Sequence, residues 1–190
     1  IIRVYDYINN KWNEFDINQA TPNTSNVTAQ YADAMDFDHS GQYIIYDALN
    51  SITKSNIESE FWDINTLHVF DLSLNHFANG QIVKLFSKLE DNTSIGNPIF
   101  SKNNTSVIAF DYMKSTGIGS YHYLYAVNTA LSDVGIISKI RSRACIPSFS
   151  IKDDQMLYNT DLDQEHQSLS VVALNDSKLT SNGSEKILLQ

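Results

Sequence analysis

Acidic residues recur at matching places in this 190-residue chain, and they are the side chains best suited to chemistry. Asp47 and Asp111 each follow a short apolar stretch that ends in an aromatic residue, and Asp161 comes just after a third such stretch. Carboxylate oxygens are ligands that calcium prefers, so a ring of these acids would form a calcium site. We favour the alternative, in which each acid bonds its own backbone and starts a turn, because turn residues recur wherever a scaffold repeats.

Aromatic residues gather where we expect long connections between strands. Aromatic side chains at such a rim are common in interfaces with proteins and peptides. The candidates for contacting a partner are Phe61, Tyr112, Tyr121 and His122. The competing explanation is packing between neighbouring sheets, which we favour for Trp62 and Tyr123.

We assign no catalytic residue. Gly117-Ile118-Gly119-Ser120 lacks the Gly-x-Ser-x-Gly pattern of a hydrolase nucleophile and the strand-to-helix context that this pattern needs. The five histidines show no spacing typical of a metal-dependent peptidase. Cys145 is the single cysteine, so the chain forms no internal disulfide, and we expect a small core residue there.

The elements that position these residues come from one cassette that occurs three times. Each copy contains a Phe, a polar turn, a short apolar strand that ends in an aromatic residue, and then Asp or Asn. The copies span residues 34–47, 97–111 and 146–159. Turn residues such as Ser40-Gly41 favour tight hairpins, and alternating apolar residues favour strands. A unit that recurs at this scale indicates a repeat architecture.

Two further strands follow each cassette, which predicts three successive four-stranded antiparallel units. The stretch from Ile2 to Phe15 matches only the last two strands of such a unit. We therefore predict an all-β fold, a β-propeller of which about three and a half blades are present. The expected boundaries are an outer half-blade and linker at 1–29 and blades at 30–89, 90–141 and 142–190. Half of a six- to eight-bladed ring is the favoured arrangement, and a four-bladed ring closed by strand exchange is the alternative. We expect one short helical turn, between Asn56 and Asp63.

The copies Pro98-Ile99-Phe100-Ser101 and Pro147-Ser148-Phe149-Ser150, with the turn and strand after each, carry a family resemblance. They resemble the WD40-like repeat of TolB-type bacterial propellers and of propeller domains in prolyl-oligopeptidase-type proteins. The first copy departs from the pattern, with Met35 in place of Pro and Asp38 in place of Ser. The resemblance implies a propeller and a periplasmic or secreted bacterial protein, but it implies no particular activity.

Composition restricts the partners. The formal net charge of −9 argues against binding to a nucleic-acid backbone, and no apolar run is long enough to insert into a membrane. We expect a non-catalytic module that binds a protein or peptide on one face of the ring and needs no cofactor, with calcium as the exception to test. The alternative is a propeller domain of a larger peptidase, or of a metal-assisted lyase or hydrolase, whose catalytic part lies outside this chain.

Overall fold

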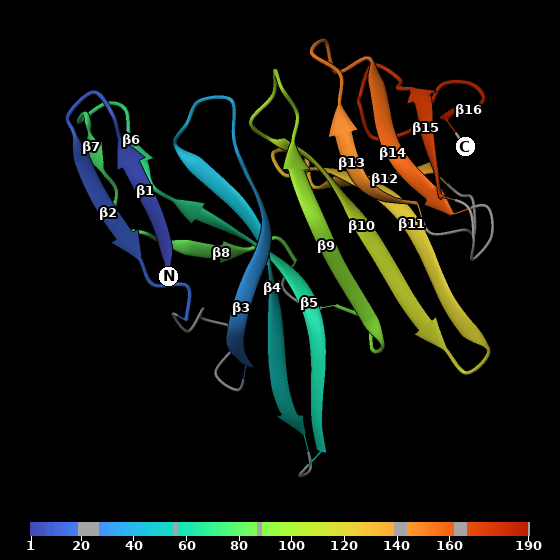
Figure 1. The fold of residues 1–190 in the computed structure, drawn as a ribbon, viewed down its shortest axis with the longest axis horizontal. Coiled ribbons are helices and arrows are strands. Elements are labelled where there is room, and N and C mark those ends of the chain that lie inside the picture. Colours follow the sequence, from blue (N-terminus) through green and yellow to red (C-terminus); the bar gives the residue numbers. More distant parts are fainter. Residues whose placement is uncertain (19–26, 55–56, 87–88, 139–143, 162–166, 190) are drawn as a thin grey trace.

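A computed structural model describes residues 1–18, 27–54, 57–86, 89–138, 144–161 and 167–189. These residues form β-strands and turns, with no helix among them. The strands build sheets that follow one another in chain order, so that the two termini lie at opposite ends of the molecule (Figure 1). The all-β prediction is confirmed for the described part of the chain.

Three four-stranded antiparallel sheets make up most of the molecule, and each is a simple meander apart from one short excursion. Sheet I consists of β3 (Val27–Phe37), β4 (Tyr43–Lys54), β5 (Ile57–His68) and β8 (Ile82–Lys84), and the excursion is the pair β6 (Phe70–Asp71) and β7 (His76–Phe77). Sheet II consists of β9 (Thr93–Phe100), β10 (Val107–Thr116), β11 (Gly119–Asn128) and β12 (Asp133–Ser138). Sheet III consists of β13 (Cys145–Phe149), β14 (Gln155–Asp161), β15 (Gln167–Ala173) and β16 (Lys186–Leu189).

A two-stranded hairpin of β1 (Ile2–Asp6) and β2 (Lys11–Phe15) precedes these sheets. Asn10 turns this hairpin with φ of 53°, a left-handed conformation that Asn tolerates better than most residues. Four-stranded antiparallel units and the N-terminal two-stranded unit are therefore confirmed as predicted.

Two local predictions are wrong. The expected helical turn before Asp63 is part of β5, which begins at Ile57 and pairs with β4 over its whole length. The second strands also continue beyond the expected ends, so that Asp47 lies inside β4 and Asp111 inside β10. The segments expected to be long loops are therefore long hairpins, whose paired backbones satisfy their own hydrogen bonds.

The hydrophobic core consists of three layers, one at each junction between successive units. In β4, Ile44 and Tyr46 pack toward the β1–β2 hairpin, whereas Ile45 packs toward sheet II. In β10, Phe110 packs toward sheet I and Ala109 toward sheet III. Because neighbouring residues of a strand point to opposite faces, a strand that is covered on both faces reads as a continuous apolar run. This explains the apolar stretch in each cassette.

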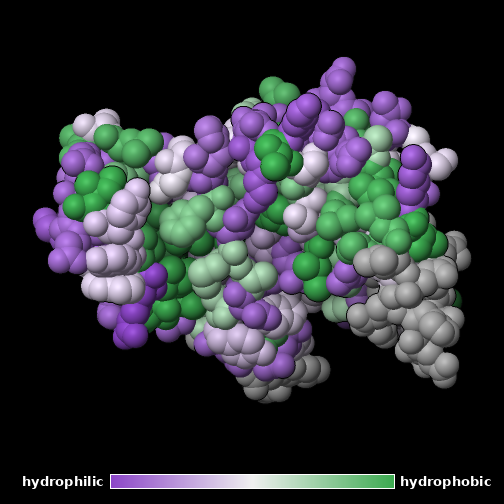
Figure 2. Space-filling view, turned by 45° about the horizontal axis from the view of Figure 1, so that its top comes forward, coloured by the Kyte–Doolittle hydropathy of each residue, from purple (hydrophilic) through white to green (hydrophobic). Residues whose placement is uncertain are grey.

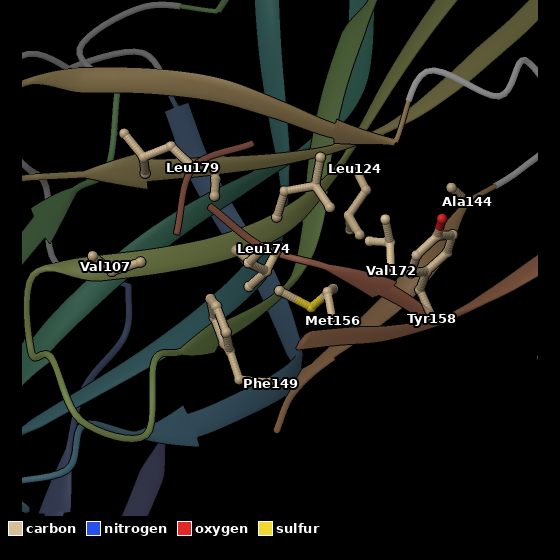
Figure 3. Close-up of a cluster of buried hydrophobic side chains, with 12 residues drawn as sticks. Val107, Leu124, Ala144, Phe149, Met156, Tyr158, Val172, Leu174 and Leu179 are labelled. Carbon is tan, nitrogen blue, oxygen red and sulfur yellow. The ribbon is translucent and has the colours of Figure 1, made fainter. Parts of the chain in front are cut away.

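The layer between sheets II and III is the clearest example (Figure 3). Leu124 of sheet II and Met156 and Tyr158 of sheet III are almost completely buried there. Burying one such side chain contributes about 1.5–3 kcal/mol, so the junction is a major source of stability. Burial also raises the pKa of the Tyr158 hydroxyl to about 12.

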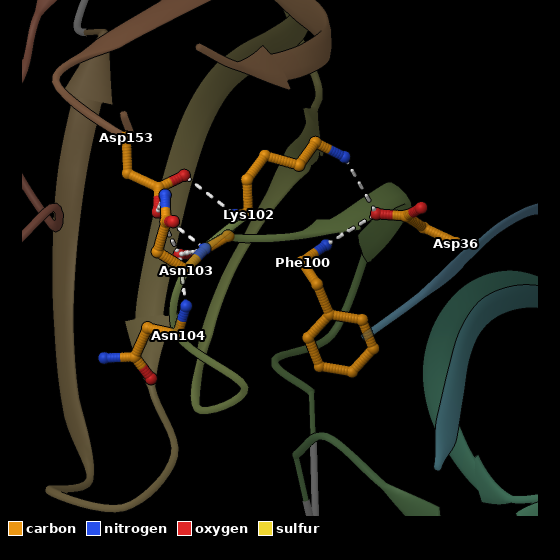
Figure 4. A network of polar contacts seen from close by, with 7 residues as sticks. Asp36, Phe100, Lys102, Asn103, Asn104 and Asp153 are labelled. Carbon is orange, nitrogen blue, oxygen red and sulfur yellow. Dashed lines mark hydrogen bonds and ion pairs between the residues drawn. The ribbon is translucent and has the colours of Figure 1, made fainter. Parts of the chain in front are cut away.

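Hydrogen bonds between the turns of sheets II and III add a polar layer at one end of the strands (Figure 4). The Asp153 carboxylate accepts hydrogen bonds from the Ser101 hydroxyl at 2.7 Å and from the backbone N–H groups of Lys102 and Asn103 at 2.8 and 2.9 Å. Burial works to raise the pKa of Asp153, but these donors outweigh it and hold the pKa below its ordinary value. Hydrophilic residues gather along this rim above sheets II and III (Figure 2).

Sheets I and II are joined in a similar way. The Asp36 carboxylate accepts a hydrogen bond from the backbone N–H of Phe100 at 3.1 Å, and the Lys102 ammonium lies 3.6 Å from the same carboxylate.

The described part of the chain contains no helix with the length and apolar character needed to cross a membrane.

Candidate functional site

A register irregularity occurs at the same place in the first strand of each sheet. The pairing shifts near Ala34 in β3, at Asn97 in β9 and at Ile146 in β13. Asn97 and Ile146 have φ of 47° and 56°, and each precedes a proline of the repeated cassette. Proline has no backbone N–H to give to a sheet, so a bulge is one of the few places in a strand that accept it. The bulge turns the preceding N–H out of the ladder.

The carboxylates of Asp47 and Asp111 accept hydrogen bonds from the N–H groups at these bulges and thereby join neighbouring sheets. Asp47 accepts hydrogen bonds from the N–H of Ala34 in its own sheet at 2.8 Å and from that of Asn97 in sheet II at 2.7 Å. Asp111 accepts one hydrogen bond from the side-chain amide of Asn97 at 2.6 Å and one from the backbone N–H of Ile146 in sheet III at 3.1 Å. The turn-starting role that we favoured for these acids is wrong, because each one bonds the bulge of the next sheet.

Burial raises the pKa of both carboxyl groups. Asp111 is 9% exposed, and its loss of solvation raises its pKa to about 7. The hydrogen bonds from Asn97 and Ile146 act to lower this pKa, and the nearby charge of Asp47 acts to raise it. Burial also raises the pKa of Asp47, opposed by its backbone donors. Gly96 permits the close approach of Asp47, since a Cβ at that position would lie 3.0 Å from the carboxylate. Asp111 can therefore exchange a proton near neutral pH.

Both acids line a groove of about 650 Å³ that spans the first strands of all three sheets. Its described lining combines three carboxylates with an indole, a thioether, an imidazole and small polar groups. The residues that supply the carboxylates, indole, thioether and imidazole are Asp33, Asp47, Trp62, Asp111, Met113 and His122. Trp62 stands edge to face against Tyr31 of β3, with the ring centres 5.5 Å apart, which fixes its indole at the wall. A concave site of this volume, apolar in part and with a few polar groups, is typical of ligand binding.

The structure separates the four predicted partner-binding residues. His122 lies in the groove, whereas its neighbour Tyr121 belongs to the other face of β11. Tyr112 packs against the core between sheets I and II, and its ring lies tilted against that of Tyr125, with the ring centres 4.9 Å apart. Phe61 lies in β5, with the Lys84 ammonium 6.0 Å from its ring centre. All four are on strands, so the expectation that they lie on connections is wrong, and their role in binding stays a prediction.

The predicted calcium ligands are only partly brought together. Asp47 and Asp111 share the groove, whereas the side chain of Asp161 lies outside what the structure describes. Among the described residues, no three His, Cys, Asp or Glu side chains meet in an arrangement that could hold a metal ion. Calcium binding stays a prediction, and calorimetric titration of the purified protein with calcium chloride would test it.

Several residues of the groove were not among the sequence predictions. Asp33 and Met113 were not considered, Trp62 was assigned to packing, and Cys145, expected to be a small core residue, is only partly buried and lines the groove. A signal was available, because Met113 is two positions after Asp111 and therefore on the same face of β10. The contribution of Asp33 depends on the bulge in β3, which no sequence pattern located.

The fold and the groove together define an all-β protein of successive propeller-like blades. A search of protein-family models found no match, and neither did a search of curated proteins. Among solved structures, the tricorn protease is similar, with a TM-score of 0.56 and 14% identity over 97% of this chain. The chain spans 18% of the length of that protease. At this identity the likeness concerns the fold alone.

Proposed function

We propose that this chain is part of a β-propeller of the TolB-like repeat type and that it binds a protein or peptide partner in the groove. The observation that carries the proposal is the groove itself, in which strands of sheets I and II bring carboxylates and apolar walls to one concave surface that reaches the first strand of sheet III. The closed ring, the blade boundaries and the extracytoplasmic location belong to the same proposal and rest on the repeat and its family resemblance.

Three features support binding rather than catalysis as the role of the groove. Asp47 and Asp111 are held by backbone and amide donors, which leaves them suited to orienting a ligand. The walls offer an indole and a thioether, which interfaces commonly use. The groove also crosses two sheet junctions, so its shape depends on side chains from several elements, as a recognition site on a repeat scaffold does.

Peptide display against the purified protein would test the proposal, with selected peptides measured by fluorescence polarisation. His122→Ala and Trp62→Ala, which alter the groove, should weaken binding by at least about tenfold if either side chain is an anchor of the interface. Tyr121→Ala is the matched control, because it changes the neighbouring position on the opposite face of the same strand. Loss of binding in the Tyr121 variant, with the groove variants intact, would place the partner on the other face and contradict the proposal.

The second candidate is the propeller domain of a larger peptidase. The likeness to the tricorn protease favours it, although that likeness concerns the fold. In this case the groove would receive substrate peptides for a catalytic unit outside residues 1–190. Assays of the complete gene product with fluorogenic peptides would test it, and an absence of hydrolysis across a broad peptide set would exclude this candidate.

A further inference from the structure

We infer that the groove takes a lysine or arginine side chain of a peptide partner, an inference that rests on the proposed function and names its ligand chemistry. The positive group would lie among Asp33, Asp47 and Asp111, and its aliphatic stem would lie along the Met113 and Trp62 walls. Lys and Arg side chains combine these two parts, an apolar stem and a cationic head.

The buried carboxylates of the groove have no positive partner in its described lining. The donors that hold Asp47 and Asp111 are neutral amide groups, and the described lining of the groove contains neither Lys nor Arg. Asp63, another buried carboxylate, has a positive partner in Lys84. Asp153 at the rim, by contrast, is held by neutral donors, as Asp47 and Asp111 are. Two buried negative charges without a positive partner repel each other, and a cation placed between them lowers this cost.

The spacing of the three acids suits a long cationic side chain. In the described part of the chain, the three carboxylates do not converge on one point as the ligands of a metal ion would. They are instead distributed along a groove of about 650 Å³, with Asp33 exposed and Asp47 and Asp111 buried. A charge carried on a long side chain suits this arrangement better than a bare ion does, because it can enter from the exposed acid and end near the buried pair.

The apolar wall of the groove suits the aliphatic stem of a Lys or Arg side chain. Trp62 is the aromatic side chain that attracts a cation most strongly, and its contact with Tyr31 keeps the ring in place. Met113 lies beyond Asp111 on the same face of β10 and adapts to an aliphatic stem. A purely acidic ligand would find no positive group on the described walls, and a neutral apolar one would leave the carboxylates unpaired.

The test compares three synthetic hexapeptide pools that are identical except at one central position. That position is Lys or Arg in the basic pool, Gln or norleucine in the neutral pool, and Glu in the acidic pool. Binding of each pool to the purified complete gene product is measured by isothermal titration calorimetry at low and at high salt. We expect the basic pool to bind about tenfold more tightly than the neutral pool, and this preference to shrink at high salt.

Two variants locate the preference in the groove. Asp33→Asn removes an exposed carboxylate of the groove, and it should weaken the basic pool by about two- to fivefold without changing the neutral pool. Asp176→Asn is the matched control, since it removes an exposed carboxylate outside the groove lining and should leave both pools unchanged.

The outcomes separate this inference from the proposed function. Equal binding of all three pools that is lost in Trp62→Ala would overturn the basic-ligand inference and keep the groove as a peptide site. Tighter binding of the acidic pool would also overturn it. An absence of binding by every pool, together with failure of peptide display, would overturn both.

Discussion

Replacing Asp111 with Asn should change how the stability of this protein depends on pH. Burial raises the pKa of Asp111 from an ordinary value of 3.8 to about 7. In the unfolded chain the group is exposed and returns to its ordinary range. Between these values the folded state holds a proton that the unfolded state has released, so the free energy of unfolding falls as the pH rises. The stabilising effect is complete below about pH 4 and is lost as the pH passes through about 7.

The magnitude follows from the size of the shift. A difference of about three pH units corresponds to about 4 kcal/mol, at roughly 1.4 kcal/mol for each unit. Asn carries no charge, so in Asp111→Asn this contribution is absent. The variant should gain about 4 kcal/mol relative to the natural protein on going from about pH 4 to about pH 8, and a constant loss from a weaker bond to Ile146 cancels from this difference. Asn already occupies the equivalent place in sheet III, at position 159, so the strand accepts the side chain.

Urea unfolding followed by circular dichroism at a series of pH values measures this difference directly. Asp176→Asn, at an exposed position, controls for the removal of one negative charge. Asp153 and other carboxylates with lowered pKa contribute a pH dependence of opposite sign, but they are common to both proteins and cancel in the comparison. Parallel pH profiles for the natural protein and Asp111→Asn would refute the reasoning, since they would mean that burial does not perturb this group.

Two further substitutions test the junctions between sheets. Asp153→Ala leaves the donors of the opposite turn without an acceptor and should lower the free energy of unfolding by about 2–3 kcal/mol. Asp154→Ala affects only side-chain contacts within its own turn and should lower the free energy of unfolding by less. Equal losses in urea unfolding would contradict the role of Asp153 as a link between sheets. Gly135→Ala would place a Cβ 2.2 Å from the Leu179 carbonyl oxygen and should lower the free energy of unfolding by about 2 kcal/mol or more. Gly117→Ala, whose Cβ would meet no atom within 4 Å, should be nearly neutral. Equal melting temperatures for the two variants would contradict the close packing of Gly135 against Leu179.

The general architecture could be predicted from the sequence because it depends on short-range patterns. Alternation and turn residues located the four-stranded units, and recurrence of the cassette set their number. The helical turn expected before Asp63 failed for a physical reason. The segment carries polar and acidic residues, which disfavour strands, but pairing with β4 over its whole length overrides that local preference.

The site was harder to predict because it depends on contacts between sheets. The recurrence of Asp47 and Asp111 was visible in the sequence, and the favoured explanation was a local turn. Their partners Asn97 and Ile146 lie 50 and 35 positions later in the chain. Those partners donate across a junction only because a bulge redirects their N–H groups, and a bulge has no sequence pattern beyond the proline that follows it.

The acids at the sheet junctions give one repeated position two roles that compete. A carboxylate at Asp111 joins sheet II to sheet III through neutral donors, and an uncharged acceptor could also make that link, with a weaker bond. The negative charge itself destabilises the folded state above about pH 7 because burial opposes it. A buried charge that destabilises the folded state but lines a groove suits a binding site for a cation. A bound cation would offset the unfavourable energy of burying that charge. If the groove binds a cation as proposed, Asn159 in β14 would not contribute to binding, because it lies outside the described groove lining.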